Sequence, residues 1–239
     1  MRKLLSFVRR AVDDYNMIEE GDKIAVGVSG GKDSITLALA LNALKRFYPK
    51  KFEIVPITLS MGFEDMDYAP LVDFFKKEGM DLIIRKTNIA EIVFDIRQEK
   101  NPCSLCAKMR RGALHDAAKD EGCNKVALGH HNDDVIETFF LSLFYEGRIG
   151  CFSPKTYLDR KDIHLIRPLI YMTESQVLSF MKRYGAPTIK NTCPADGATK
   201  RQYMKETVAQ LNRENHGLPE RVFTAIKSSL EDWKTEGDV

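Results

Sequence analysis

The 239-residue sequence lacks any apolar run long enough to cross a membrane, since a spanning helix needs about 20 such residues. Its richest stretch, residues 35–44, is interrupted by Thr36 and Asn42. The apolar part of the first ten residues is too short for a secretory signal. These absences predict a cytoplasmic protein that does not associate with membranes.

Cysteine and net charge are also scarce. Five cysteines, an odd number, argue against a disulfide framework and favour core thiols, metal ligands or catalytic groups. Lysine and arginine total 36 against 34 acidic residues, a net charge of +2, which excludes a generally basic nucleic-acid coat. Hydrophobic residues make up 44% of the chain, enough for a core, so general disorder is excluded.

Apolar strand-like runs alternate with helix-like segments along most of the chain. We predict strands at residues 23–29, 52–59, 82–86, 125–129 and 164–169. We predict the intervening and following helices at residues 35–46, 70–78, 108–120 and 134–145, and one starting at Thr173. Such alternation predicts an α/β fold, a Rossmann-like, doubly wound parallel sheet of five strands.

The predicted chain has three parts. Residues 1–20 form an amphipathic N-terminal helix, and residues 21–197 form the α/β domain. Strand patterns then cease, and residues 198–239 form a helical C-terminal extension.

A glycine-containing loop, Ser29-Gly-Gly-Lys-Asp-Ser34, joins the first predicted strand to its helix. Gly30 and Gly31 let the backbone approach a ligand, and the free N–H groups of the following helix start favour an anion such as phosphate. The hydroxyls of Ser29 and Ser34 and the charge of Lys32 add donors, whereas Asp33 suits a helix cap or a metal-bound water. A plain strand-to-helix turn is the alternative.

This loop resembles the pyrophosphatase loop of the N-type ATP pyrophosphatases, the PP-loop superfamily with an adenine nucleotide alpha hydrolase-like fold. The resemblance implies that the chain binds ATP with Mg²⁺, releases pyrophosphate and transfers adenylate to a substrate oxygen. The ATP-binding residues that it implies are Ser29, Gly30, Gly31, Lys32, Asp33, Ser34 and Gly129.

A second motif, Gly129-His-His-Asn-Asp-Asp134, leaves the fourth predicted strand at the same sheet edge. Asp133 and Asp134 are candidates for Mg²⁺ binding or acid–base work, and either could instead cap the following helix. His130 is as well explained by packing as by catalysis.

Cys103 and Cys106 form a C-x-x-C pair just before the helix predicted at residue 108. The spacing suits one metal ion or cluster, and it leaves zinc or a redox pair as alternatives. Cys193 lies in a loop rich in turn formers, unlike an ordinary core thiol. Cys123 and Cys151 are expected to be core or turn thiols.

Together these motifs resemble the TtcA-type tRNA cytidine 2-thiolation enzymes, from residue 16 to about residue 210. The resemblance implies adenylation of the O2 oxygen of an anticodon-loop cytidine and its replacement by sulfur, giving 2-thiocytidine. It also implies a 4Fe-4S cluster with one open iron, a tRNA substrate, a cysteine desulfurase as sulfur supplier, and a homodimer. The ligands implied are Cys103, Cys106 and Cys193, and the catalytic residues are Lys32, Arg110, Asp133 and Asp134.

Two alternatives remain at this point: a related 2-thiouridine synthetase, and a non-enzymatic ATP- or RNA-binding module with zinc. The charge distribution favours RNA binding. Residues 97–111 hold five basic residues and one acidic, and residues 182–205 hold six basic and one acidic. Positive charge therefore gathers around the predicted cluster ligands, where RNA phosphates would lie.

Overall fold

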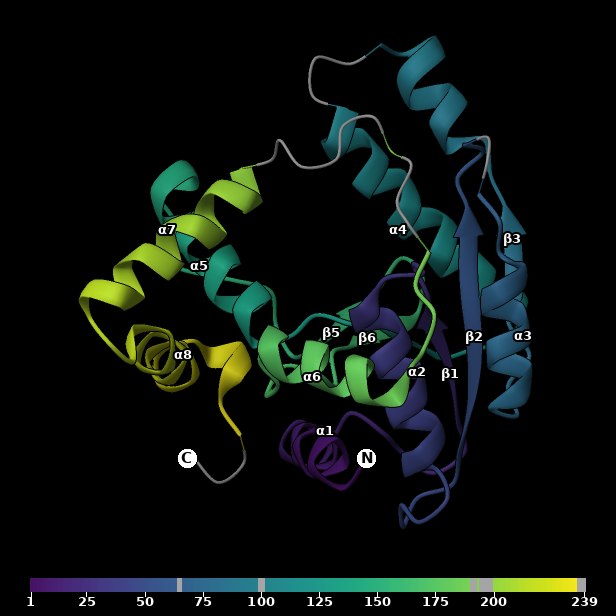
Figure 1. Ribbon diagram of the computed structural model, residues 1–239, viewed down its shortest axis with the longest axis horizontal. Coiled ribbons are helices and arrows are strands. Elements are labelled where there is room, and N and C mark those ends of the chain that lie inside the picture. Colours follow the sequence, from purple (N-terminus) through teal and green to yellow (C-terminus); the bar gives the residue numbers. More distant parts are fainter. Residues whose placement is uncertain (64–65, 99–101, 190–192, 194–199, 236–239) are drawn as a thin grey trace.

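The computed structural model describes residues 1–63, 66–98, 102–189, 193 and 200–235. Within those ranges six strands form a single sheet in the order β3-β2-β1-β4-β6-β5 (Figure 1). Their bounds are Asp22–Gly27 (β1), Phe52–Ser60 (β2), Ile83–Lys86 (β3), Lys125–Ala127 (β4), Lys155–Leu158 (β5) and Ile163–Ile166 (β6).

The predicted α/β class is confirmed, but the predicted number of five strands is wrong. All neighbouring strands pair in parallel except β5, which pairs with β6 in antiparallel register. β5 is a four-residue edge strand with no fully buried residue, so it lacks the apolar run by which a buried parallel strand is recognised.

The helices correspond to the predicted segments. They are α1 (Arg2–Asp14), α2 (Lys32–Leu44), α3 (Ala69–Lys77), α4 (Pro102–Asp120), α5 (Asn132–Glu146), α6 (Glu174–Tyr184), α7 (Lys200–Glu214) and α8 (Leu218–Ser229). A π-helical turn at Glu91–Ile96 and a 3₁₀ turn at Glu231–Trp233 complete the described elements. α4 begins before the predicted residue 108, so the C-x-x-C pair lies inside its first turns and not ahead of the helix.

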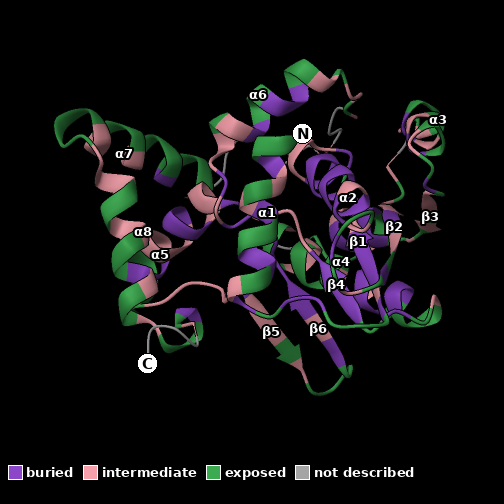
Figure 2. Cartoon of the chain, turned by 90° about the horizontal axis from the view of Figure 1, so that it is seen from below, coloured by how far each residue is buried: buried purple, intermediate pink, exposed green. Residues whose placement is uncertain are grey.

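The two faces of the sheet pack against different helices. Ile24 and Val26 of β1 join a core shared with α1, α2, α3 and α6, whereas Ala25 points to a smaller core against α4. Because β1 is buried on both faces, its residues from Ile24 to Gly27 are apolar without alternation. Figure 2 shows buried residues concentrated in β1, β4 and α2, while α7 is largely exposed.

The C-terminal helices attach to the same core. Ile226 of α8 and Trp233 are fully buried, and the Trp233 ring meets Tyr15 edge-on at a centroid distance of 6.0 Å. The Tyr15 hydroxyl donates a hydrogen bond of 3.2 Å to the Trp233 carbonyl. No helix among the described residues is long and apolar enough to cross a membrane.

The strand order places a topological switch point between β1 and β4. From β1 the sheet grows through β2 and β3 on one side, and through β4, β6 and β5 on the other. The segments that follow β1 and β4 therefore leave adjacent carboxyl ends in diverging directions, which is where open α/β sheets bind ligands. These segments are residues 29–34 and 129–134, the two motifs singled out by the sequence.

Candidate active site

The loop after β1 is closed by its own hydroxyl groups. The Ser29 N–H donates to the Ser34 Oγ at 3.1 Å, and the Ser34 Oγ donates to the Gly31 carbonyl at 2.9 Å. Gly31 is the N-cap of α2 and no side chain caps the helix. The N–H groups of this helix start are therefore left for a ligand, as an anion site requires.

Two glycines permit close approaches at this loop. Gly30 has φ = +84°, and a Cβ there would lie 3.0 Å from the Cβ of Ile189, whose N–H donates to the Gly30 carbonyl. Gly129 lies against the opposite side of the loop. A Cβ on Gly129 would lie 3.0 Å from the carbonyl carbon of Asp33 and 3.1 Å from the Ser34 nitrogen.

The charged residues of the loop are paired with acidic and basic groups of distant helices. The Lys32 Nζ lies 3.0 Å from the Asp33 Oδ2 and 3.1 Å from the Glu174 Oε1 at the start of α6. Burial alone would lower the pKa of Lys32, but these two carboxylates raise it. The other oxygen of Glu174, Oε2, lies 2.6 Å from the Lys205 Nζ on α7.

The motif after β4 meets the loop through His131. Its Nε2 lies 3.6 Å from the Asp33 Oδ1, and its Nδ1 lies 3.4 Å from the Asp134 Oδ2. Asp134 accepts the N–H of His131, the N-cap of α5, so the predicted capping role is present. Its other oxygen lies 2.7 Å from the guanidinium of Arg201 on α7.

Asp133 connects this motif to α6, because its Oδ2 accepts the backbone N–H of Glu174 at 2.7 Å. Glu137, one helical turn further along α5, is buried. Burial first, and the negative charge of Asp134 second, raise the pKa of Glu137 to about 7. The structure thus gathers a cluster of carboxylates and cations around the loop, the ATP-loop cluster: Lys32, Asp33, His131, Asp133, Asp134, Glu137, Glu174, Arg201 and Lys205.

The three predicted cluster ligands form a second group. Cys103 is exposed in the first turn of α4, and Cys106 and Cys193 are half-buried. Burial raises the pKa of the Cys106 thiol, Cys193 and Cys103 raise it further, and the nearby Arg110 opposes them. Cys103, Cys193 and Arg110 are therefore each close enough to Cys106 to influence its thiol.

Comparisons with known proteins agree with this arrangement. The model of the PP-loop domain matches residues 2–212. This chain belongs to the PP-loop family. It is 37% identical over 228 residues to a tRNA-cytidine(32) 2-sulfurtransferase of Geobacter metallireducens, covering 94% of this chain and 89% of that one. A protein of the same description from Pelobacter propionicus is 40% identical over 230 residues, covering 95% and 86%.

A solved structure has the same fold. The U34-tRNA thiolase NcsA from Methanococcus maripaludis, described with its [4Fe-4S] cluster, aligns with a TM-score of 0.75 at 23% identity, over 93% of this chain and 76% of that chain. The predicted PP-loop family and fold are thereby confirmed.

The donor chemistry of the loop cluster and of the three cysteines suits the two metal groups that the sequence resemblances implied, Mg²⁺ for the PP-loop and a 4Fe-4S cluster for the TtcA-type enzymes. The Oδ1 of Asp33 is buried without a hydrogen-bond partner, and carboxylate oxygens are the ligands that Mg²⁺ prefers. Three neighbouring thiols suit an iron–sulfur cluster. Within the described ranges no three His, Cys, Asp or Glu side chains form a ready metal-binding group, so the individual ligands stay predictions.

His130 is a packed residue of this PP-loop domain. Its ring lies 4.8 Å from that of Phe152, and burial, followed by the charge of Arg167, lowers its pKa to about 4. A histidine that stays neutral at pH 7 and stacks on an aromatic ring fits the packing interpretation better than a catalytic one.

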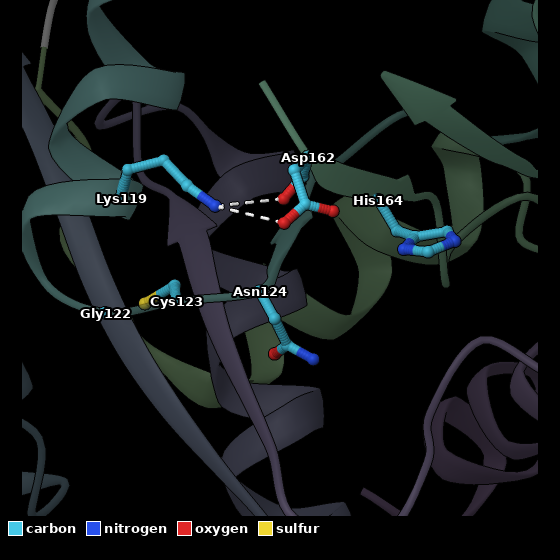
Figure 3. Close-up of a pocket in the computed structure, with 6 residues that line it drawn as sticks. All are labelled: Lys119, Gly122, Cys123, Asn124, Asp162 and His164. Carbon is cyan, nitrogen blue, oxygen red and sulfur yellow. Dashed lines mark hydrogen bonds and ion pairs between the residues drawn. The ribbon is translucent and has the colours of Figure 1, made fainter. Parts of the chain in front are cut away.

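A hollow of the described surface lies away from this site. A cavity of about 330 Å³ is lined by residues that include Lys119, Cys123 and His164 (Figure 3). Lys119 and Cys123 precede β4, and His164 lies in β6 opposite Lys125, the first residue of β4. The cavity therefore lies at the opposite sheet edge from the PP-loop. Burial raises the pKa of the Cys123 thiol to about 11, and this cysteine is the expected core thiol.

Five members of the ATP-loop cluster were not among the predicted site residues. His131 lies inside the motif after β4 but was given no role of its own. Arg201 and Lys205 lie on α7, far from the loop in sequence, and Glu174 was expected only as part of a helix start. Glu137 follows the motif by three residues, and no periodicity indicates that it is buried. The predicted residues Lys32, Asp33, Gly129, Asp133 and Asp134 do lie together.

Proposed function

We propose that the protein is an ATP-dependent tRNA sulfurtransferase that converts an anticodon-loop cytidine, at position 32 as its relatives' names state, to 2-thiocytidine. The proximity of Cys193 and Cys103 to Cys106, whose pKa both of them raise, carries the proposal. Cys193 and the Cys103–Cys106 pair come from distant segments of a chain that belongs to the PP-loop family, so a sulfur site and a nucleotide site would share one domain.

In the first half of the reaction, the O2 oxygen of the cytidine attacks the α-phosphorus of ATP. The bond to the β-phosphate oxygen breaks and pyrophosphate leaves. Negative charge grows on the phosphates, and the N–H groups at the start of α2 and the Lys32 ammonium lie where they stabilise it. Asp33, Asp133 and Asp134 would hold Mg²⁺, which neutralises the phosphates when bound.

In the second half, the C2 carbon gains sulfur and loses AMP. Cys103, Cys106 and Cys193 would hold a 4Fe-4S cluster, which would supply the sulfur that replaces the oxygen. Arg110, next to Cys106, would stabilise the thiolate forms of these ligands and face the departing phosphate.

The tRNA contact follows from charge and accessibility. Lys108, Arg110 and Arg111 are exposed on α4 beside the cysteines, and cations on one surface bind RNA phosphates. A stacked base cannot reach either group of residues, so the cytidine must turn out of an unpaired loop.

Further parts of the proposal follow from the proposed chemistry. Sulfur would come from a cysteine desulfurase, and the enzyme would act in the cytoplasm, where tRNA is processed, as a monomer or a homodimer. Residues 21–197 would form the catalytic domain, with residues 1–20 and 198–239 as helical additions.

Nucleoside mass spectrometry of tRNA from cells lacking the gene tests the proposal. We expect 2-thiocytidine to disappear and to return when the wild-type gene is restored. Loss of 2-thiouridine instead would reassign the substrate. Unchanged tRNA, together with zinc and no iron in anaerobically purified protein, would favour a non-enzymatic module.

A further inference from the structure

Two chains of charged contacts join the PP-loop to one face of α7. In the first, the carboxylate of Glu174 lies between the Lys32 Nζ, at 3.1 Å, and the Lys205 Nζ, at 2.6 Å. In the second, His131 lies between Asp33 of the loop and Asp134. The Asp134 carboxylate in turn lies 2.7 Å from the Arg201 guanidinium. Arg201 and Lys205 are four residues apart, so both project from the same side of α7.

Glu174 is held in place independently of its two lysines. It is the first residue of α6, which starts with a capping box between Thr173 and Gln176. Its backbone N–H donates to the Asp133 Oδ2 at 2.7 Å. The Glu174 side chain is about 20% exposed to solvent. A carboxylate fixed in this way directs any ammonium group that binds it.

The lysines by themselves are flexible. Each has four rotatable side-chain bonds and loses rotamer freedom when it is fixed. The Lys205 side chain is 45% exposed, and among the described residues it is the contact with Glu174 that places its ammonium group beside that of Lys32. Although burial alone would raise the pKa of Glu174, Lys205 and Lys32 keep it below its ordinary value, so the carboxylate is charged at neutral pH.

We propose that Glu174 is a positioning residue with two targets: it aims Lys32 at the transferring phosphates, and it anchors Lys205, and with it α7, to the ATP site. The kinetic part of this inference rests on the proposed function. α7 follows Cys193 in the chain, so a helix fixed to the PP-loop also limits how far Cys193 can lie from the ATP site.

Removing the charge of Glu174 separates positioning from binding. A Glu174→Gln variant loses a negative charge beside a polyanion, which does not weaken the attraction of ATP. We therefore expect kcat for tRNA-dependent pyrophosphate release to fall about tenfold, from misplacement of Lys32, without a rise in the KM for ATP. A Lys205→Met variant keeps the Lys32–Glu174 pair and should lose much less kcat.

Amide hydrogen exchange gives a readout that needs no activity. In both variants the backbone amides of residues 200–205 should exchange about threefold faster than in the wild type. This is the effect expected from the loss of one partly exposed ion pair. Glu206→Gln, which alters an exposed glutamate on the same helix, is the matched control and should change neither kinetics nor exchange. Thermal melting checks that each variant is folded.

Unchanged exchange of α7 in Lys205→Met would overturn the anchoring role, and a raised KM with normal kcat in Glu174→Gln would overturn the aiming role. If the wild-type protein releases no pyrophosphate with tRNA, the proposed function fails while the exchange result still decides the anchoring role.

Discussion

Gly129 is the point where the motif after β4 touches the ATP loop, and a single added methyl group tests that contact. In Gly129→Ala the new Cβ would lie 3.0 Å from the Asp33 carbonyl carbon, 3.1 Å from the Asp33 oxygen and 3.1 Å from the Ser34 nitrogen. All three are backbone atoms in the first turn of α2, so no flexible side chain can move aside.

The size of the effect follows from the displacement. Ordinary contacts of a Cβ begin at 3.4 Å, so the loop and the strand end must separate by a few tenths of an ångström. Overpacking of this kind costs about 1–3 kcal/mol of stability. A misplacement of about 1 Å at a catalytic group lowers the rate about 100-fold. A displacement of a few tenths of an ångström should therefore lower kcat/KM for ATP about fivefold.

The assay is pyrophosphate release with ATP and tRNA under anaerobic conditions, accompanied by urea unfolding. Gly150→Ala is the matched control, because nothing lies within 4 Å of a Cβ there and its φ is outside the left-handed region. If Gly129→Ala matches Gly150→Ala in both stability and kcat/KM, the close approach between the strand end and the loop is not a feature of the working enzyme.

Three further variants probe other parts of the structure. Lys125→Met leaves the buried Asp22, 2.7 Å from the lysine, without its counter-ion and should lower the free energy of unfolding by about 3–5 kcal/mol; a loss under 1 kcal/mol in urea titrations would contradict this. Glu137 has a pKa of about 7 in the folded protein, above its ordinary value of 4.5, so the stability that its protonated form gives the fold is fully present below pH 4.5 and is lost as the pH rises through 7. Relative to Glu137→Gln, the wild type should lose about 3 kcal/mol between pH 4.5 and 8, and parallel stability curves would refute the shift. Cys193→Ala should prevent the visible absorption of a reconstituted cluster whereas Cys151→Ala should not, and a cluster retained in the first variant would remove Cys193 from the ligand set.

The elements that the sequence predicted well are those with strong local patterns. β1 contains an uninterrupted apolar run from Ile24 to Gly27, α2 is apolar on almost every face, and α6 starts with a capping pair that the structure contains. β5 was missed because its stability comes from pairing with β6 and not from its own composition. The start of α4 was placed late because Pro102 was not recognised as a first-turn residue, a position that proline favours.

The site divides in the same way. Residues 29–34 and 129–134 could be placed together from sequence, because parallel strands bring their carboxyl ends to one edge. The partners of the loop on α6 and α7 could not be predicted, since an ion pair such as Lys205–Glu174 depends on how helices pack after a long connection. No periodicity or motif encodes that distance.

The balance of charge in the ATP-loop cluster gives a physical reason for a divalent cation. The cluster contains five carboxylates but only three permanent cations. The acids are Asp33, Asp133, Asp134, Glu137 and Glu174, and the cations are Lys32, Arg201 and Lys205. ATP adds several negative charges to a site that is already acidic, so binding the nucleotide alone would be opposed by repulsion. Burial is the main cause of the raised pKa of Glu137, and the charges of Asp134 and Asp133 add to it. A bound Mg²⁺ would relieve the repulsion for the carboxylates and the phosphates together, and the pKa of Glu137 should then lose the part of its rise that these two carboxylates contribute.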